Sequence, residues 1–163
     1  MIAKKLVLVS AILLGCSIAM YSQEYKSAIG LRLGYPTSIS YKQFISDPGA
    51  FEIFAGFRTW TGYSWMNIGA MYQHHMRIEG APGLKWYFGG GGSVFFWNYK
   101  NSFNSGDAGN TSIGLMGVLG LDYKFTDAPV NLSLDWAPIL FVNGYDNGFR
   151  GAYGALSARY TLK

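Results

Sequence analysis

Charged side chains are scarce in this chain of 163 residues, where Lys, Arg, Asp and Glu together make up 13%. Soluble domains carry about 25%, so the chain has few charges with which to cover a water-facing surface. Without Lys4 and Lys5, which lie in an N-terminal leader, 11 of the 13 basic residues remain against 9 acidic ones. So small an excess of positive charge argues against a nucleic-acid partner.

Cysteine is nearly absent, since the only one is Cys16 in the N-terminal stretch MIAKKLVLVSAILLGCSIAMYSQ. A basic start, the apolar core Leu6–Leu14 and the small residues that follow are typical of a secretory signal peptide. We therefore predict a signal peptide over residues 1–22 and a mature domain over 23–163 without a disulfide. The letters LLGC resemble a lipoprotein processing box, so lipidation of Cys16 is the alternative to its removal with the leader.

Long hydrophobic runs are also missing. The apolar core of the leader is shorter than the roughly 20 residues that a membrane-spanning helix needs, and no later segment could form such a helix. An exported chain with strands and no such helix indicates the outer membrane of a didermic bacterium.

What the chain has instead is strand-like alternation, most clearly in Thr111–Phe125, TSIGLMGVLGLDYKF. One set of alternate residues is apolar: Ile113, Leu115, Gly117, Leu119, Leu121, Tyr123 and Phe125. The other set is small, mixed and finally charged: Ser112, Gly114, Met116, Val118, Gly120, Asp122 and Lys124. Successive side chains of a strand point to opposite faces, so the segment predicts a long strand with a lipid-like outer face.

The same alternation recurs along the mature chain. It predicts eight strands: Tyr25–Tyr35, Ser38–Ile45, Phe51–Trp60, Trp65–His75, Leu84–Tyr99, Thr111–Phe125, Val130–Val142 and Tyr153–Lys163. Turn signals at Ser46–Gly49, Glu79–Gly83 and Thr126–Pro129 predict periplasmic turns. Extracellular loops are expected near Pro36 and Thr61, and over Lys100–Asn110 and Asn143–Arg150.

Charged residues decide between the barrel and a soluble sheet protein. Those of the predicted strands fall on the inward face: Arg32, Lys42, Glu52, Arg58, Lys85, Asp122, Lys124, Asp135 and Arg159. A soluble β-sandwich or lipocalin-type barrel would show the reverse pattern. We therefore predict an all-β fold, an eight-stranded antiparallel transmembrane (outer-membrane) β-barrel.

The inward charges are predicted to form a network in which the carboxylates accept hydrogen bonds from Arg and Lys and help block the lumen. The pairing stays open, because it depends on strand register. The alternative is a set of solvated charges in a lumen that holds water.

The mature part resembles the small outer-membrane β-barrel proteins of the OmpA/OmpX/OmpW-like type. The likeness rests on EYKSAIGLRLGYP, WYFGGGGSVFFW, GLDYKFTDAPVNLSLDW and the ending GALSARYTL. The alternating Tyr160 and Leu162 resemble an outer-membrane assembly signal, although the commonest form ends on Phe or Trp and this chain ends on Lys163. The resemblance implies the fold, the location, outer-membrane lipids as surroundings, and periplasmic chaperones and the barrel-assembly machinery as partners in biogenesis.

Catalytic and cofactor-binding signals are weak. Gly89–Gly92 lacks the Gly-Lys-Ser/Thr and the following helix of a phosphate loop, so it is better explained by strand bending or close packing. His74 and His75 point to opposite faces of one strand at its periplasmic end, which disfavours a shared metal and the lipid-modifying chemistry of barrel enzymes near the outer leaflet. We therefore expect no enzyme activity, no cofactor and no metal.

The remaining expectations concern the outer end of the barrel. About eight strands leave a lumen that side chains can fill, so open diffusion is disfavoured. The aromatic residues expected there, a candidate ligand mouth or else an interfacial belt, are Trp60, Phe95, Trp97, Tyr99 and Phe141. A structural or surface-interaction role through loops 100–110 and 143–150 is expected. Binding or limited transport of a small apolar or lipid-like ligand is the alternative.

Overall fold

The computed structural model describes residues 25–61, 63–99, 111–143 and 147–162. The predicted signal peptide with Cys16, the loop 100–110 and the middle of the second loop lie outside the described residues. Among the residues described, none belongs to a helix with the length and apolar character needed to cross a membrane.

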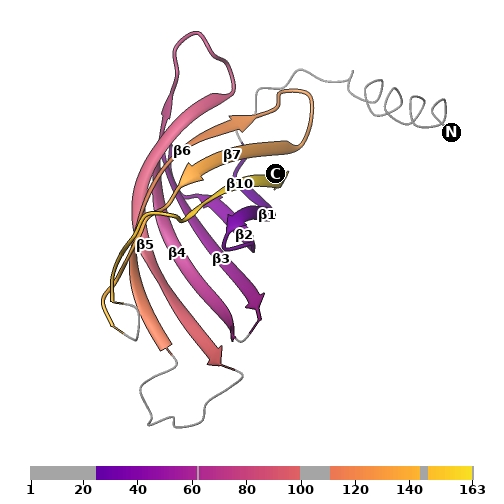
Figure 1. The fold of residues 1–163 in the computed structure, drawn as a ribbon. Coiled ribbons are helices and arrows are strands. Elements are labelled where there is room, and N and C mark those ends of the chain that lie inside the picture. The colour runs from indigo at the N-terminus through magenta and orange to yellow at the C-terminus, as the bar shows by residue number, and fades with distance from the viewer. Residues whose placement is uncertain (1–24, 62, 100–110, 144–146, 163) are drawn as a thin grey trace, which may run out of the picture.

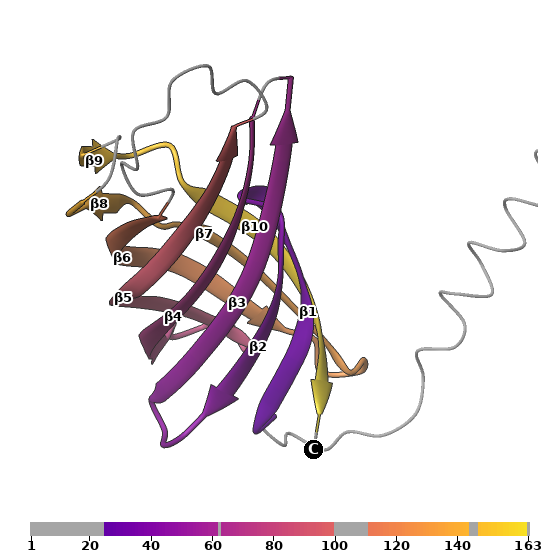
Figure 2. The same ribbon diagram turned by 90° about the horizontal axis from the view of Figure 1, so that it is seen from below.

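The fold consists of antiparallel strands that close into a barrel (Figure 1). The strands are β1 (Ser27–Tyr35), β2 (Ser38–Phe44), β3 (Gly49–Trp60), β4 (Tyr63–Arg77), β5 (Leu84–Tyr99), β6 (Thr111–Lys124), β7 (Val130–Trp136), β8 (Ile139–Phe141), β9 (Gly148–Arg150) and β10 (Gly154–Leu162). Each of β1 to β6 pairs with the next strand in sequence, and β10 pairs with both β7 and β1 (Figure 2). The wall is therefore a closed ring of eight strands, and the predicted all-β, eight-stranded antiparallel barrel is confirmed.

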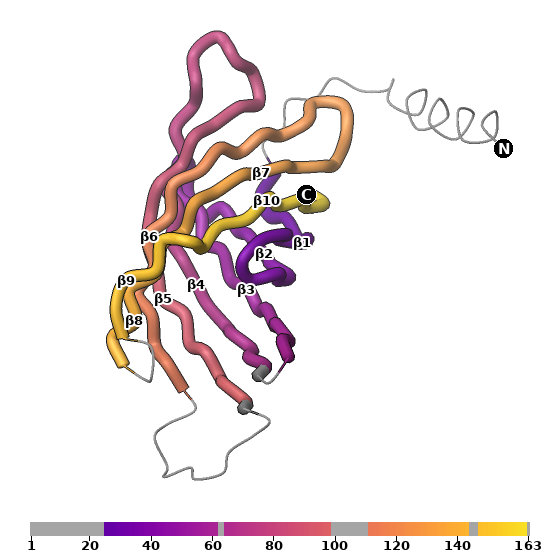
Figure 3. The backbone as a smooth tube through the Cα atoms, in the orientation of Figure 1, coloured from indigo at the N-terminus to yellow at the C-terminus, as the bar shows by residue number. Residues whose placement is uncertain are grey.

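The two short strands β8 and β9 extend the barrel at one end. There β8 pairs with β6 and β9 pairs with β8. Figure 3 shows both at the end of the barrel where β5 stops and β6 begins. We call this the loop end, and the end where β1 begins and β10 stops the terminal end.

Two boundary predictions need correction. The predicted strand Val130–Val142 is split into β7 and β8, because Pro138 has no N–H for the ladder and interrupts the pairing. The predicted loop Asn143–Arg150 contains β9, whose residues pair with β8.

Gly89–Gly92 does not interrupt its strand, since β5 runs without a break from Leu84 to Tyr99. A Cβ atom on Gly89 would lie 1.9 Å from the Tyr72 carbonyl oxygen, and one on Gly91 would lie 2.0 Å from that of Ala70. No side chain fits at such distances, so these two glycines allow the close approach of β4 and β5.

The barrel has an apolar exterior and a polar or aromatic interior. On β6 the predicted exterior set is 43–56% exposed at Ile113, Leu115, Leu119 and Leu121. The alternate set is at most 7% exposed at Ser112, Met116, Val118 and Asp122. This is the reverse of a water-soluble sheet protein, in which exposed faces carry the polar residues.

Tyr35 is an exception to the predicted faces. Alternation along β1 placed it outside, with Leu31 and Leu33, whereas its ring lies 4.8 Å from that of Tyr153 and packs against the interior aromatic cluster. β1 ends at Tyr35 before Pro36, so the strand pleat no longer fixes the direction of this side chain.

Candidate functional site: the lumen and its loop end

Glu52 on β3 is the centre of a buried group of polar side chains. One of its oxygens accepts a hydrogen bond from Arg32 Nη1 at 3.1 Å and a second from Arg159 Nη2. Its other oxygen accepts one from Gln73 Nε2 at 2.6 Å. Its side chain is completely buried, so each of these bonds acts in a medium that screens charge weakly.

Asp135 on β7 completes this central network. It accepts a hydrogen bond from Arg32 Nη2 at 2.9 Å and another from the hydroxyl of Tyr87 at 2.9 Å. Arg32 therefore bridges the carboxylates of β3 and β7 across the lumen. Arg159 also donates to the hydroxyls of Ser40 at 3.0 Å and Ser133 at 2.7 Å.

A second network lies around Asp122 on β6. Lys42 Nζ donates to one carboxylate oxygen at 2.9 Å, and Asn131 Nδ2 donates to the other at 2.7 Å. The hydroxyl of Tyr25 lies 3.4 Å from the same second oxygen. Tyr25 precedes β1, so this contact brings the start of the described chain over the terminal end of the lumen.

Six of the nine charges predicted to face inward are thus paired with one another. Three are cations, Arg32, Lys42 and Arg159, and three are carboxylates, Glu52, Asp122 and Asp135. All six residues are at most 7% exposed. Equal numbers of opposite charges, each hydrogen-bonded, avoid the cost of an uncompensated buried ion.

Lys124 does not join these networks, contrary to its predicted place in the lumen. Its Nζ donates to the backbone oxygens of Phe125 and Ala128 in the turn after β6. Lys124 is the last residue of its strand, so its long side chain bends toward the turn.

Arg58 and Lys85 have aromatic neighbours. The guanidinium carbon of Arg58 lies 4.4 Å from the ring centroid of Tyr35 and 5.4 Å from that of Trp60. Lys85 Nζ lies 5.5 Å from the ring centroid of Phe44, at the terminal end. Neither contact is part of the two carboxylate networks described above.

Neither histidine lies in an arrangement typical of catalysis. His75 is 2% exposed, its Nε2 lies 3.2 Å from Gln73 Oε1, and its ring stacks on that of Tyr87 at 4.8 Å. His74, on the opposite face, packs against Phe88. Within the described residues there is no group of three His, Cys, Asp or Glu side chains that could hold a metal ion.

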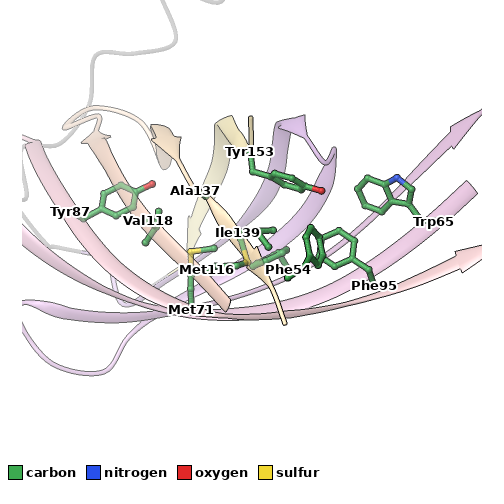
Figure 4. Close-up of a cluster of buried hydrophobic side chains, with 11 residues drawn as sticks. Phe54, Trp65, Met71, Tyr87, Phe95, Met116, Val118, Ala137, Ile139 and Tyr153 are labelled. Carbon is green, nitrogen blue, oxygen red and sulfur yellow. The ribbon is translucent and has the colours of Figure 1, made fainter. Parts of the chain in front are cut away.

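Aromatic side chains fill the lumen toward the loop end. Trp65, Phe95, Phe141 and Tyr153 are at most 6% exposed and contact one another edge to face or tilted. Figure 4 shows Trp65 at one end of this cluster and Tyr87 at the other, with Met71 and Met116 between them. Between the charged networks and the loop end, the interior is therefore filled by aromatic and apolar side chains.

The five residues of the candidate ligand mouth have different surroundings. Phe95 and Phe141 are buried against each other at 5.1 Å, and Trp97 stacks on Phe95 at 6.0 Å. Trp60 is 57% exposed, and the side chain of Tyr99 lies outside the described part. Phe95, Phe141 and Trp97 are therefore packing residues of the lumen in the described structure.

A cavity of about 400 Å³ lies beside this cluster, at the loop end of β3, β4 and β5. Two exterior rows line it, an apolar row of Phe57, Met66 and Phe96 and a polar row of Thr59, Ser64 and Asn98. Between them lies the row of Arg58, Trp65 and Trp97, which has inward parity. Only two of these residues, Arg58 and Trp97, are candidate site residues of the sequence analysis, because a hollow across three strands depends on their register.

Sequence reasoning also missed the uncharged members of the networks. Gln73, Tyr87 and Asn131 each donate a hydrogen bond to a buried carboxylate. Their inward position follows from strand alternation, which was the available signal. Their partners do not follow from it, since these bonds join different strands.

The comparisons with known proteins agree with this fold. No family model matches the chain, and neither does any curated protein. Among solved structures, the crystal structure of Neisserial surface protein A matches with a TM-score of 0.50 at 19% sequence identity. The match covers 83% of this chain and 93% of that protein.

The chain has the fold of a small outer-membrane-type β-barrel. At 19% identity the likeness to Neisserial surface protein A carries the fold alone. Function must therefore be argued from the residues of this chain.

Proposed function

We propose that this protein spans the outer membrane of a didermic bacterium as a closed barrel with a structural or surface-interaction role and no catalytic activity. The observation that carries the proposal is the reversed distribution of polarity. Leu31, Ile53 and Leu134 are more than half exposed on the exterior, while Arg159, Glu52 and Lys42 are at most 2% exposed inside. Water would make such a surface unfavourable, whereas hydrocarbon suits it.

The filled lumen supports a scaffold in preference to an open pore. One polar network runs from β3 through Arg32 to β7 and the other joins β2 to β6, and the aromatic cluster fills the lumen toward the loop end. Side chains alone can fill a barrel of eight strands. The resemblance to the OmpA/OmpX/OmpW-like proteins is part of this proposal, as are export by the signal peptide and assembly by chaperones and the barrel-assembly machinery.

Membrane insertion is tested by refolding the mature chain into lipid vesicles. We expect it to float with the vesicles after an alkaline wash, to give a β-type circular dichroism spectrum and to migrate differently on gels before and after heating. A water-soluble monomer in the absence of detergent would contradict the proposal.

The surface-interaction role is assigned to residues 100–110 and 143–150, because loops on a rigid scaffold commonly carry recognition. Deleting both segments should preserve heat-modifiable migration and abolish adsorption of any phage or partner that recognises the protein. A matched deletion at the turn Glu79–Gly83 of the terminal end should leave adsorption unchanged. Adsorption that survives the deletion of both loops would refute this assignment.

A second function, the binding of a lipid-like ligand, is favoured by the cavity at the loop end of β3, β4 and β5. The hollow is open to its surroundings, and the exterior row Phe57, Met66 and Phe96 gives it an apolar side. An enzymatic role is the weakest candidate, because the stacking and hydrogen bond of His75 suit a packed interior residue.

A further inference from the structure

Trp65 carries a buried hydrogen-bond donor without a partner. The residue is 2% exposed, and no described residue accepts a hydrogen bond from its indole Nε1. Trp97, its neighbour on β5, differs in this respect, because its Nε1 donates to the hydroxyl of Ser112 at 3.0 Å. A buried N–H group that lacks an acceptor is unfavourable and rare in folded proteins. An acceptor from outside the described chain is therefore expected at Trp65.

Arg58 lies directly opposite Trp65 in the register of β3 and β4, and both residues have inward parity. Within the described part of the chain, Arg58 has neither a hydrogen bond nor an ion pair. Its guanidinium carbon lies 4.4 Å from the ring centroid of Tyr35 and 5.4 Å from that of Trp60. A guanidinium stacked on a ring keeps its N–H groups in its own plane, where an acceptor can reach them.

The ring of Tyr35 contacts both groups, since its centroid also lies 5.9 Å from that of Trp65. Tyr35 packs against the interior aromatic cluster, so both sets of donors are on the lumen side of the wall. In Figure 4, Trp65 stands at the end of this cluster farthest from Tyr87, and its indole nitrogen is on the side of the ring away from Tyr87. Arg58 is half-buried and Trp60 is 57% exposed, so a solute can reach them from the loop end. We call Tyr35, Arg58, Trp60 and Trp65 the Arg58 site.

The charge at the Arg58 site is not neutralised by a carboxylate among the described residues. The buried carboxylates of the lumen pair with other cations, namely Arg32, Lys42 and Arg159. Glu52 is on the same strand as Arg58 but six residues earlier, which is about 20 Å along a strand. A half-buried cation with free N–H donors is complementary to an anion.

We propose that the Arg58 site binds the carboxylate of a small aromatic acid. A carboxylate carries one negative charge, which Arg58 matches, and its oxygens can accept from the guanidinium fork and from the Trp65 indole N–H together. The rings of Tyr35 and Trp60 offer faces on which the aromatic body of the acid can stack. The inference goes beyond the proposed scaffold role and needs only the folded barrel.

The test is fluorine nuclear magnetic resonance of para-fluorobenzoate, titrated with the refolded mature barrel in lipid nanodiscs. We expect the unmodified protein to bind one molecule, and Arg58→Gln to bind it at least about tenfold more weakly, as for loss of a charge-assisted pair. Arg58→Lys should bind with intermediate affinity, because an ammonium lacks the planar fork. The matched control is Arg77→Gln, which removes an exposed positive charge paired with Asp47 and should not change the affinity.

Trp65→Phe separates the indole N–H from the ring, because phenylalanine keeps an aromatic side chain without a donor. We expect it to weaken binding of para-fluorobenzoate about tenfold, as for loss of a hydrogen bond to a charged group. Its unfolding midpoint without the acid should not fall, because the N–H has no partner among the described residues. The matched control is Trp136→Phe on the exterior, which removes an N–H that donates to the Gly151 carbonyl oxygen and should not change the affinity.

Three other probes test the class of ligand. The neutral para-fluorobenzamide should bind weakly, and equally to the unmodified protein and Arg58→Gln. Trifluoroacetate bound as tightly as para-fluorobenzoate would refute the aromatic part of the proposal. Tighter binding of para-fluorophenyl phosphate, with the same dependence on Arg58, would overturn the assignment to a carboxylate.

Equal binding of para-fluorobenzoate by the unmodified protein and Arg58→Gln would overturn the proposal, and so would an equal loss in Arg77→Gln. Unchanged binding by Trp65→Phe would show that the indole N–H does not contact the acid, and would refute the site as proposed. Heat-modifiable migration and vesicle flotation are measured on every variant. A barrel that floats but does not bind the acid refutes this inference alone, whereas a chain that does not float refutes the proposed membrane location.

Discussion

Glu52→Gln is the most informative single change, because Glu52 accepts hydrogen bonds from more buried side chains than any other described carboxylate. It accepts hydrogen bonds from Arg32, Arg159 and Gln73, and its side chain is completely buried. Glutamine keeps the shape and removes the charge. Arg32 would retain Asp135, but Arg159 would lose its only carboxylate partner among the described residues and keep neutral acceptors alone, the two serine hydroxyls and the new amide oxygen.

The expected cost follows from that arrangement. Removing one partner of a buried ion pair leaves an uncompensated charge and lowers stability by about 3–5 kcal/mol. The control is Asp47→Asn, whose partner Arg77 lies 3.1 Å away on the surface, with side chains 58% and 69% exposed. An exposed pair of this kind contributes about 0–1 kcal/mol.

The assay is urea-induced unfolding in lipid vesicles, followed by tryptophan fluorescence and by gel migration. We expect the free energy of unfolding to fall by about 3–5 kcal/mol for Glu52→Gln, and by less than about 1 kcal/mol for Asp47→Asn. Adding Arg159→Met to Glu52→Gln should restore part of the loss, because it removes the unpaired cation. Equal stability of Glu52→Gln and the unmodified protein would refute the view that these charges are paired and dry.

Three further predictions concern the lumen and the wall. Asp135→Ala should lower the free energy of unfolding by about 3–5 kcal/mol. The unmodified protein should give almost no steady conductance in planar bilayers. Unchanged unfolding midpoints together with steady conductance would indicate a water-filled channel. Gly91→Val should prevent formation of the heat-modifiable barrel, because its Cβ would lie 2.0 Å from the Ala70 carbonyl oxygen. Gly92→Val should fold, because the nearest atom to its Cβ is 3.5 Å away. Equal folding of both variants would contradict the close packing of β4 and β5. Ile68→Lys, on the exterior, should cost about 2–4 kcal/mol in vesicles if this site lies near the bilayer midplane, and a neutral effect on unfolding would count against contact with hydrocarbon.

The faces of the strands could be predicted from the sequence because alternation is a local property. On β6, a side chain such as Leu115 or Asp122 has its face fixed by its parity within the strand, and the structure agrees at both positions. The rule fails at strand ends. Tyr35 and Lys124 are terminal residues, so their side chains follow a turn instead of the pleat.

The pairing inside the lumen could not be predicted, because it depends on register and on barrel closure. Glu52 and Arg159 are 107 residues apart in the sequence and meet only when β10 closes against β1. Arg58 shows the same limit. Its inward parity was predictable, but its contact with Tyr35, and the lack of a carboxylate partner among the described residues, depend on how the strands close.

The most direct test of the central claim, an apolar exterior in contact with lipid, is spin-label accessibility along β6 in vesicles. Single cysteines replace residues of the mature chain in turn, on the exterior at Leu115 and Leu119 and in the interior at Met116 and Val118. We predict that exterior labels collide often with oxygen and rarely with a water-soluble nickel reagent, while interior labels collide rarely with both. Exterior labels that collide mainly with the nickel reagent would show that this face meets water, and would contradict the account.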